Sequence, residues 1–464
     1  MNAPLQSPRE AGLTEALDRR HLMHPFADLH HMAQSERTVI ARAKGNYVWD
    51  ESGRRFLDGL GGMWCSNIGH GREEMADAIS EQVRTLDYYS PFDDLCNPAM
   101  ADLGAKLASY APGDLNRVIF STCGSTAADS AIRIVHHYWH RLGQPQRQHI
   151  LTRHHAYHGS TYITASLSDP GYSDGWLRED GFIHHLQAPY SYRNGRGMSE
   201  AEFCDVLIEE MRSTIERIGP DRVACFIGEP IQGSGGVIVP PAGYHRRSLE
   251  LCHSYGILYV SDEVVTAFGR LGHMIASEAR FGITPDIITC AKGLTSGYVP
   301  LAATILSVRI HEVLSAPGAY FNNGFTYSGH PVACRAALKN IEIIEREKLC
   351  DRVVRMGPLL EEVLAPLREL PLVGDVRGSH FMMCVEYVQD KEERRLFDGS
   401  TRIGKRIWRN CQKRDLLVRP LEHLNVFSPP LTLEEDEIRF IGRVMHDAVL
   451  DTADELTREG VRFG

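Results

Sequence analysis

Lys292 is the residue of this sequence best suited to covalent chemistry. It follows the apolar run Ile287–Cys290 directly and precedes Gly293. Lysine is rarely buried without a partner, and a desolvated lysine has a lowered pKa and becomes a nucleophile for carbonyl groups. Lys292 could therefore form a Schiff base with an aldehyde. The ordinary alternative, which this segment alone favours, is a strand-end lysine whose ammonium group reaches water.

Asp262 ends a second apolar run, within Val260–Val264. A carboxylate at such a place can keep a pyridinium nitrogen protonated, so that the ring accepts electrons. The segment alone is equally compatible with an aspartate that binds a metal or caps a helix.

A phosphate site is suggested by Ser121–Thr126, which follows a strand and opens a helix over about 127–142. A helix N-terminus offers free N–H groups and the positive end of a dipole. Gly124 would let the backbone approach a phosphate closely, and the hydroxyls of Ser125 and Thr126 could add hydrogen bonds. An ordinary Ser/Thr helix cap is the commoner explanation.

Tyr157 lies just past another apolar run and could stack on a pyridine ring, although it could equally be an ordinary loop tyrosine. Three histidines surround it, at His154, His155 and His158. Their spacing lacks the helix and the acidic partner of a zinc-protease site, so no metal is expected.

The elements that must position these residues form a repeating pattern. Short apolar runs alternate with helical stretches, which predicts an α/β fold with a mostly parallel sheet covered by helices. Ligands bind beyond the carboxyl ends of such strands, where the residues above lie. We expect a large domain over residues 75–340 and a smaller α+β domain over 341–464. Residues 1–74, with a hairpin at Tyr47–Leu60, would pack with the smaller domain.

Composition excludes several classes of protein. The chain has 464 residues and a net charge of −10, without a basic tract for nucleic acid. It contains neither an apolar run of 18 residues nor the pattern of a signal peptide, so no membrane span is expected. The 11 cysteines are scattered without a Cys-x-x-Cys pair, which favours a reducing, cytoplasmic location.

Five motifs together resemble one family. They are Gly61–Cys65, Glu229–Gly233, Asp262–Val264, Ala291–Gly293 and Gly324–Pro331. In this order, and over nearly the whole chain, they resemble class III pyridoxal-phosphate aminotransferases of fold type I, in the omega-amine:pyruvate branch.

The resemblance implies a role for each matching residue. Lys292 would hold pyridoxal 5'-phosphate and move the proton, and Asp262 would pair with the pyridine nitrogen. The other implied cofactor contacts are Gly124, Ser125, Thr126, Tyr157, Val264 and Thr326. The implied substrate contacts are Phe26, Trp64, Tyr157 and Arg419, the last for carboxylates. Thr326 would reach the phosphate bound in a partner subunit, which implies a homodimer with shared sites, possibly paired into a tetramer.

The sequence departs from the family pattern at three places. Thr126 stands where the phosphate loop usually carries Glu. Ser234 stands where relatives that act on glutamate carry the Glu that pairs with the carboxylate-binding arginine, so Arg419 would lack that partner. Asp93 and Asp94 replace aromatic side chains that usually line the pocket.

The resemblance implies transfer of an amino group to pyruvate, which gives alanine and an aldehyde or ketone. The donor would be an omega-amino acid, a diamine or polyamine, or another primary amine. A decarboxylase or aminomutase of the same fold remains an alternative, as does a metal hydrolase built on the histidines. A binding protein without activity is disfavoured, because Lys292 and Asp262 are both present.

Overall fold

The computed structural model of the chain describes residues 12–464, and a seven-stranded sheet forms its centre. The strands of this sheet, in spatial order, are β4 (Leu115–Ser121), β10 (Ala302–Ser307), β9 (Ile287–Cys290), β8 (Leu258–Asp262), β7 (Val223–Gly228), β5 (His149–Arg153) and β6 (Ile183–Leu186). β9, β8, β7, β5 and β6 run parallel, and β10 is antiparallel to both of its neighbours. The expected α/β fold with a mostly parallel sheet is therefore confirmed.

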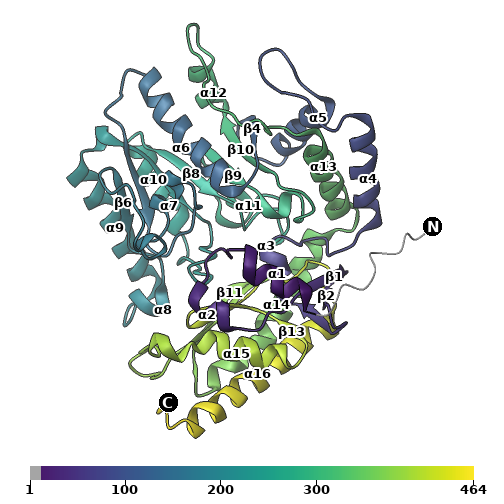
Figure 1. Cartoon of the computed structure of the whole chain (residues 1–464). Coiled ribbons are helices and arrows are strands. Elements are labelled where there is room, and N and C mark those ends of the chain that lie inside the picture. Colours follow the sequence, from purple (N-terminus) through teal and green to yellow (C-terminus); the bar gives the residue numbers. More distant parts are fainter. Residues whose placement is uncertain (1–11) are drawn as a thin grey trace.

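Helices cover both faces of the large sheet (Figure 1). Those around it are α4 (Glu73–Thr85), α5 (Pro98–Ala108), α6 (Gly124–Arg141), α7 (Tyr162–Leu167), α9 (Glu200–Ile218), α10 (Tyr244–Ser254), α11 (Ala276–Phe281), α12 (Val308–Leu314) and α13 (Pro331–Arg346). Successive strand residues point to opposite faces: Leu258 and Val260 pack with α6, and Tyr259 packs with α9 and α10. Burial on both faces explains why these strands read as continuous apolar runs.

A second, four-stranded sheet lies in the C-terminal part of the chain. Its strands are β11 (Val373–Ser379), β12 (Met382–Tyr387), β15 (Leu424–Phe427) and β14 (Arg419–Leu421), all paired antiparallel. The helices of this region are α14 (Leu349–Leu364), α15 (Ile403–Gln412) and α16 (Glu435–Arg458).

The N-terminal part forms a third sheet that includes a strand from near the other end of the chain. Its strands are β1 (Ile40–Lys44), β2 (Tyr47–Asp50), β3 (Arg55–Asp58) and β13 (Leu416–Leu417). β2 and β3 form the hairpin that the sequence predicts, and β3 pairs in parallel with β13. The short helices α1 (Leu13–His21), α2 (Leu29–Gln34) and α3 (Gly61–Trp64) also belong to this part, and α8 (Ser191–Asn194) precedes α9.

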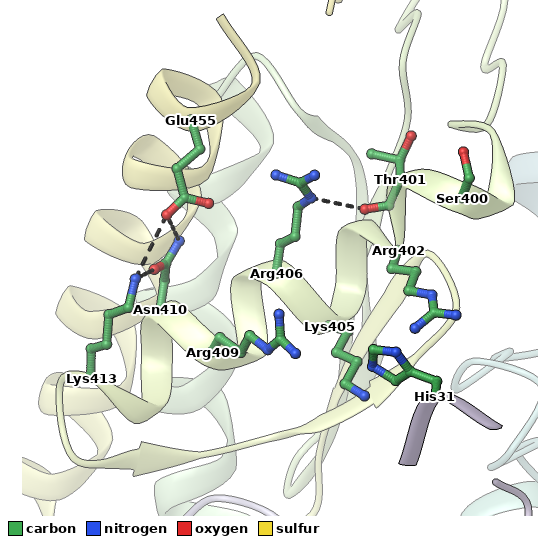
Figure 2. A pocket seen from close by; sticks show the side chains of 10 residues that line it. All are labelled: His31, Ser400, Thr401, Arg402, Lys405, Arg406, Arg409, Asn410, Lys413 and Glu455. Atoms are coloured by element: carbon green, nitrogen blue, oxygen red, sulfur yellow. Dashed lines mark hydrogen bonds and ion pairs between the residues drawn. The ribbon is translucent and has the colours of Figure 1, made fainter. Parts of the chain in front are cut away.

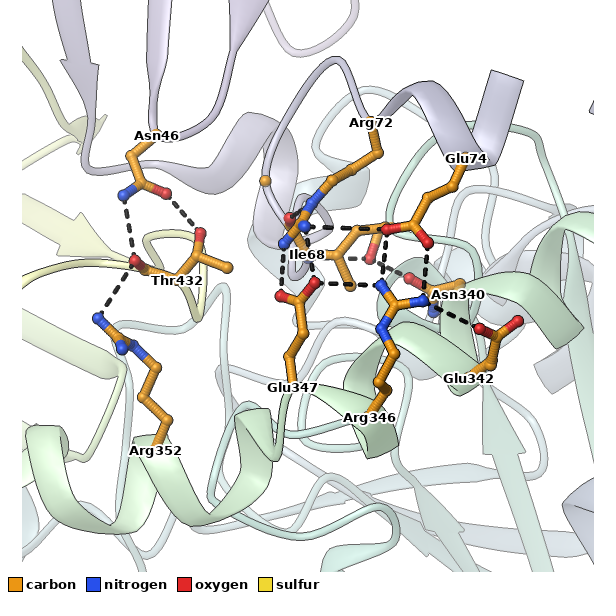
Figure 3. Close-up of polar contacts among 12 residues, drawn as sticks. Asn46, Ile68, Arg72, Glu74, Asn340, Glu342, Arg346, Glu347, Arg352 and Thr432 are labelled. Carbon is orange, nitrogen blue, oxygen red and sulfur yellow. Dashed lines mark hydrogen bonds and ion pairs between the residues drawn. The ribbon is translucent and has the colours of Figure 1, made fainter. Parts of the chain in front are cut away.

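Ion pairs join the N-terminal part to α13 and its C-terminal end (Figure 3). Both guanidinium nitrogens of Arg72 donate to Glu347 at 2.7 Å, and those of Arg346 donate to Glu74 at 2.8 and 2.7 Å. Such two-bond pairs fix orientation as well as distance. The domain boundaries at 74/75 and 340/341 stay a prediction. Of the helices between residues 12 and 464, none combines the length and apolarity that crossing a bilayer requires.

Candidate active site

A pocket lies at the carboxyl ends of the central strands, where the sequence places its reactive residues. It is lined by Thr122, Cys123, Gly124, Ser125, Tyr157, His158, Gly159, Glu229, Ser234, Asp262, Val264, Val265, Ala291, Lys292, Thr295, Gly297, Val299, Pro300 and Leu301. Six of the predicted site residues thus share one pocket: Gly124, Ser125, Tyr157, Asp262, Val264 and Lys292.

Lys292 begins a short 3-10 turn directly after β9. Its φ is 43°, a conformation uncommon outside glycine and often found at functional sites. Burial lowers the pKa of its ammonium group, and this effect opposes the nearby charges of Asp262 and Glu229, which favour the protonated form. With no hydrogen bond or ion pair to any residue from 12 to 464, the amine is available for chemistry.

Asp262 ends β8 and is 3% exposed. Its Oδ1 accepts hydrogen bonds from the Thr289 hydroxyl at 3.1 Å and the Val264 amide at 3.2 Å. Its Oδ2 lies 2.6 Å from Nδ1 of His158, whose side chain is fully buried. These contacts fix the carboxylate at the pocket wall. The sequence suggests for His158 only a place in a metal site, whereas the structure places it against Asp262.

The loop before α6 leaves room for a group at the helix N-terminus. A Cβ at Gly124 would lie 2.9 Å from Cγ1 of Val264, so no larger residue fits without a shift. Ser125 Oγ accepts a hydrogen bond from the Ser160 amide at 3.1 Å. Gly159 has a φ of +143°, and a Cβ there would lie 2.5 Å from Ser125 Oγ. Neither of these close approaches is visible in the sequence, because each joins distant segments.

Thr126 has a local role in the structure. Its hydroxyl donates to the carbonyl of Cys123 at 2.8 Å and lies 3.1 Å from the Cys123 amide, and so it caps α6. Thr126 is absent from the pocket lining. This is the ordinary helix-cap interpretation of the loop, so cofactor binding by Thr126 stays a prediction without support from the geometry.

Glu229 is a pocket residue whose role the sequence pattern does not indicate. Its Oε1 accepts from the Tyr157 amide at 3.0 Å and its Oε2 from the Gly233 amide at 2.7 Å. The side chain is buried, and burial raises the pKa of its carboxyl group. Glu229 therefore holds the Tyr157 loop and the segment at Gly233 at a fixed separation.

Aromatic residues surround Tyr157. Its ring centroid lies 5.9 Å from that of Phe26 and 5.4 Å from that of Tyr172, both in edge-to-face arrangements. The structure thus brings the predicted substrate residue Phe26 next to the pocket from the N-terminal part of the chain.

Trp64 lies elsewhere. It is 1% exposed and packs in an apolar cluster with Ile231, Met382 and Leu424, outside the residues that line the pocket. Its indole nitrogen is buried and has no hydrogen-bond partner within residues 12–464. Trp64 is therefore buried and does not line the pocket of its own chain, so its contact with substrate stays a prediction.

Arg419 begins β14 and is partly buried near Tyr172, and its pKa is lowered by that burial. It makes neither an ion pair nor a side-chain hydrogen bond with the described part of the chain. Ser234 lines the pocket, and its carbonyl accepts a hydrogen bond from the Tyr172 hydroxyl at 3.4 Å. The guanidinium group is thus a cation without a carboxylate partner.

Thr326 lies outside the pocket in an exposed loop before α13. Its carbonyl accepts a hydrogen bond from the Tyr88 hydroxyl at 2.7 Å. Asp93 and Asp94, in the loop between α4 and α5 that carries Tyr88, are also exposed. These two loops lie side by side, away from the pocket of their own chain.

Comparison with known proteins matches residues 30–449 to the family model for class III aminotransferases. The chain is a class III aminotransferase. A putrescine–pyruvate aminotransferase of Pseudomonas aeruginosa is 38% identical and is aligned over 91% of this chain and 93% of its own length. A diaminobutyrate–2-oxoglutarate transaminase of Halomonas elongata is also 38% identical, over 96% and 97%. The crystal structure of an (S)-enantioselective omega-transaminase from Thermomicrobium roseum superimposes with a TM-score of 0.93 at 40% identity, over 95% of this chain and 99% of the other.

Aminotransferases of this family depend on pyridoxal phosphate and share fold type I. The pocket of this aminotransferase fits the three recognisable groups of that cofactor. The N-terminus of α6 beside Gly124 suits the phosphate, and the buried carboxylate of Asp262 suits the pyridine nitrogen. The amine of Lys292, which is unpaired within residues 12–464, suits the aldehyde. No group of three or more His, Cys, Asp or Glu side chains within residues 12–464 is arranged to hold a metal ion.

Proposed function

We propose that this aminotransferase moves an amino group from a diamine or another primary amine to pyruvate, which gives alanine and an aldehyde or ketone. The observation that carries the choice of acceptor is Arg419, a partly buried cation whose charge acts on Lys292 and which has no carboxylate partner among residues 12–464. The roles of the individual residues, the substrates and the dimer described below are parts of the same proposal.

Pyridoxal phosphate, when bound, supplies an electron-accepting ring. Asp262 would pair with its nitrogen, held in place by His158 and Thr289. Lys292 would hold the cofactor and would then take the proton from the amine-bearing carbon of the donor and deliver it to the cofactor. A neutral amine is needed to accept that proton, and the lowered pKa of Lys292 supports this role.

Gly124, Ser125 and the N-terminus of α6 would hold the phosphate. Tyr157 and Val264, which line the pocket, would contact the ring. Glu229 would keep Tyr157 in place through its backbone amide. Phe26, which lies against Tyr157, would contact the donor.

Pyruvate is favoured over 2-oxoglutarate because of Ser234. An acid at position 234 would neutralise Arg419 until the second carboxylate of a substrate displaced that acid. A serine at this position leaves the guanidinium group free to bind the one carboxylate of pyruvate. Overall similarity does not decide the acceptor. The two relatives named above are equally identical to this chain, although one is named for pyruvate and the other for 2-oxoglutarate.

A homodimer is supported by the surface around Thr326. The exposed large apolar side chains of the two adjacent loops are Tyr89, Phe92, Leu95, Tyr320, Phe321 and Tyr327. Several exposed large apolar side chains on neighbouring loops are typical of an interaction site. We propose that it packs against a second copy of the chain, so that Thr326 serves the phosphate of that copy and Asp93 and Asp94 lie at its pocket entrance.

The two acids at that entrance favour a cationic donor. A negative entrance raises the local concentration of cations, and the distal ammonium group of a diamine could pair with one carboxylate. The name of the P. aeruginosa relative, which specifies putrescine, is consistent with this donor class.

A donor panel with pyruvate, measured as alanine formed, tests the proposal. We expect putrescine to outperform an uncharged-tail aryl-alkyl amine at low salt, and the double variant Asp93→Asn/Asp94→Asn to narrow this difference. Asp447→Asn/Asp454→Asn, which removes two exposed charges from α16, is the matched control. Equal donor rankings in the two double variants would refute the role of the acids.

Arg419→Lys tests the acceptor separately. Lysine cannot form the two parallel hydrogen bonds that arginine gives a carboxylate, so KM for pyruvate should rise while KM for a simple amine stays near the wild-type value. An equal rise for both substrates would indicate a structural role instead.

A further inference from the structure

A second cavity lies against α15 and is also lined by residues of α2 and α16 (Figure 2). It encloses about 350 Å³, a volume suited to a small molecule. Its lining residues are His31, Ser400, Thr401, Arg402, Lys405, Arg406, Arg409, Asn410, Lys413 and Glu455. It shares no residue with the candidate active site.

Five cationic side chains and one carboxylate line this cavity, in a chain whose net charge is −10. Three of the cations have a carboxylate partner: Arg402 with Asp28 at 3.0 Å, Arg406 with Glu459 at 2.7 Å, and Lys413 with Glu455 at 3.7 Å. Lys405 and Arg409 have none among residues 12–464. The cavity therefore carries positive charge that the described protein does not neutralise.

The spacing on α15 explains why the cations converge. Lys405, Arg409 and Lys413 follow one another at intervals of four residues, which places them on one side of the helix and its C-terminal extension. Like charges at this spacing destabilise a helix. Burial lowers the pKa of Lys405, and the charges of Arg409 and Arg402 lower it further. The arrangement thus has an electrostatic cost in the ligand-free protein.

His31 closes the cavity from α2, and its ring lies beside Lys405 in Figure 2. Its Nε2 is buried and has no hydrogen-bond partner in the described part of the chain. A buried ring nitrogen without a partner is uncommon in native proteins, and a ligand in this cavity would supply one. The hydroxyl of Thr401 adds a further donor at the same wall, whereas the hydroxyl of Ser400 donates to Asp398 at 2.5 Å.

From this geometry we propose that the cavity binds a small molecule carrying at least two negative charges on phosphate groups. Guanidinium groups match phosphate oxygens with two parallel hydrogen bonds, and Lys405 adds a point charge. The concave shape favours a small ligand over an extended polyanion, which a flat or grooved surface would suit better. The site is independent of pyridoxal phosphate, whose pocket lies at the large sheet.

Isothermal titration calorimetry tests this with inorganic pyrophosphate as the probe. The enzyme is saturated with pyridoxal phosphate, so that its own phosphate site is filled, and the buffer contains chloride at physiological strength. We expect saturable binding of pyrophosphate, weakened at least about tenfold in Lys405→Gln/Arg409→Gln, because each charge-assisted hydrogen bond to a phosphate contributes strongly. Alanine formation by the variant should equal that of the wild type.

Arg212→Gln/Arg246→Gln is the matched control, because it removes two exposed cations from α9 and α10. Its affinity for pyrophosphate should be unchanged. Should Lys405→Gln/Arg409→Gln fail to fold, the single variant Arg409→Gln carries the same prediction with a loss of at least about threefold.

Three results would overturn the proposal: no saturable binding of pyrophosphate to the wild type, equal affinity in the wild type and the Lys405/Arg409 variant, or equal losses in that variant and the control. An acidic peptide or an RNA oligomer that binds at this site and is not displaced by pyrophosphate would also overturn it, in favour of a macromolecular partner.

Discussion

Asp262 is held by three hydrogen bonds that differ in kind. The contact with His158, at 2.6 Å, is to a fully buried imidazole, whereas the contacts with Thr289 and Val264 are longer. A short hydrogen bond between a carboxylate and a ring nitrogen is the strongest of the three. We therefore expect the rate of the reaction to depend more on the charge of Asp262 than on any one of the hydrogen bonds that support it.

Asp262→Asn should lower the rate of the half-reaction with an amine donor more than tenfold, since loss of a charge-assisted hydrogen bond costs about 1.5–3 kcal/mol and tenfold corresponds to ~1.4 kcal/mol. The rate is followed through the visible absorbance of the cofactor in a stopped-flow instrument. Thr289→Val, which removes the 3.1 Å contact alone, should cost less than tenfold. Equal effects of the two substitutions would contradict the role of the charge.

His245 on α10 gives the protein a pH-dependent stability. Its Nε2 donates to the carbonyl of Pro230 at 2.8 Å, and its Nδ1 lies 3.1 Å from the Tyr259 hydroxyl, so the buried ring is neutral. Burial lowers its pKa to about 3. Below pH 6.5 the unfolded chain therefore binds a proton that the folded chain does not, and stability falls as the pH falls.

Between pH 7 and pH 5, this group should remove about 2 kcal/mol from the free energy of unfolding. His245→Gln should retain a donor to Pro230 without titrating, so its stability should fall less over the same interval. Guanidinium unfolding at both pH values measures the difference, and the exposed His446→Gln is the control. A pH dependence equal to that of the control would show that His245 does not contribute.

The residues that act through their own position in a motif could be predicted from sequence, and those that act through a distant partner could not. Asp262 ends one apolar strand and Lys292 follows the end of another by two residues, which the sequence displays directly. The role of His158 depends on its contact with Asp262, 104 residues away, and the role of Glu229 depends on its hydrogen bond with Tyr157, 72 residues away. Such pairs depend on the order of the strands in the sheet, which the sequence pattern does not contain.

The position at which α6 begins determines which residues can contribute to the candidate phosphate site. The helix begins at Gly124, about three residues earlier than the sequence pattern predicts. The first turn therefore contains the glycine that lies against Val264. The hairpin at β2 and β3 could be predicted because its turn is local, whereas the antiparallel direction of β10 could not, since it depends on the connection around the sheet.

Gly124→Ala should weaken retention of the cofactor, because the added methyl group would lie 2.9 Å from Val264 and would move either the loop or the valine. Retention after dialysis is measured from the visible absorbance. Gly104→Ala is the matched control, since a Cβ there meets nothing within 4 Å and alanine favours the helix by up to about 1 kcal/mol. Retention that is the same in both variants would show that the close approach at Gly124 is unimportant.

At the scale of the whole molecule, Thr326 is exposed and lies outside the pocket of its own chain. In the proposed dimer it serves the phosphate bound by the partner subunit. A mixture of Thr326→Ala and Lys292→Ala subunits tests this arrangement, because a mixed dimer would contain one site with both defects and one site with neither.

We expect alanine formation to reappear when the two inactive or weakened variants are mixed under conditions that allow subunit exchange. Native mass spectrometry confirms that mixed dimers are present. Mixed dimers without recovered activity would show that Thr326 does not serve the partner's site, and a chain that remains monomeric would contradict the proposed dimer itself.

The parallel pairing of β3 with β13 has a consequence for synthesis on the ribosome. Residues 57–58 lie against residues 416–417, so the partner strand is made roughly 360 residues after the first. At a translation rate of about 5–20 residues per second, β3 is synthesised some 20–70 s before β13. During that time the nascent hairpin exposes an unpaired edge, a feature that promotes aggregation. Molecular chaperones that shield nascent chains should therefore raise the yield of active enzyme, most of all when translation is slowed.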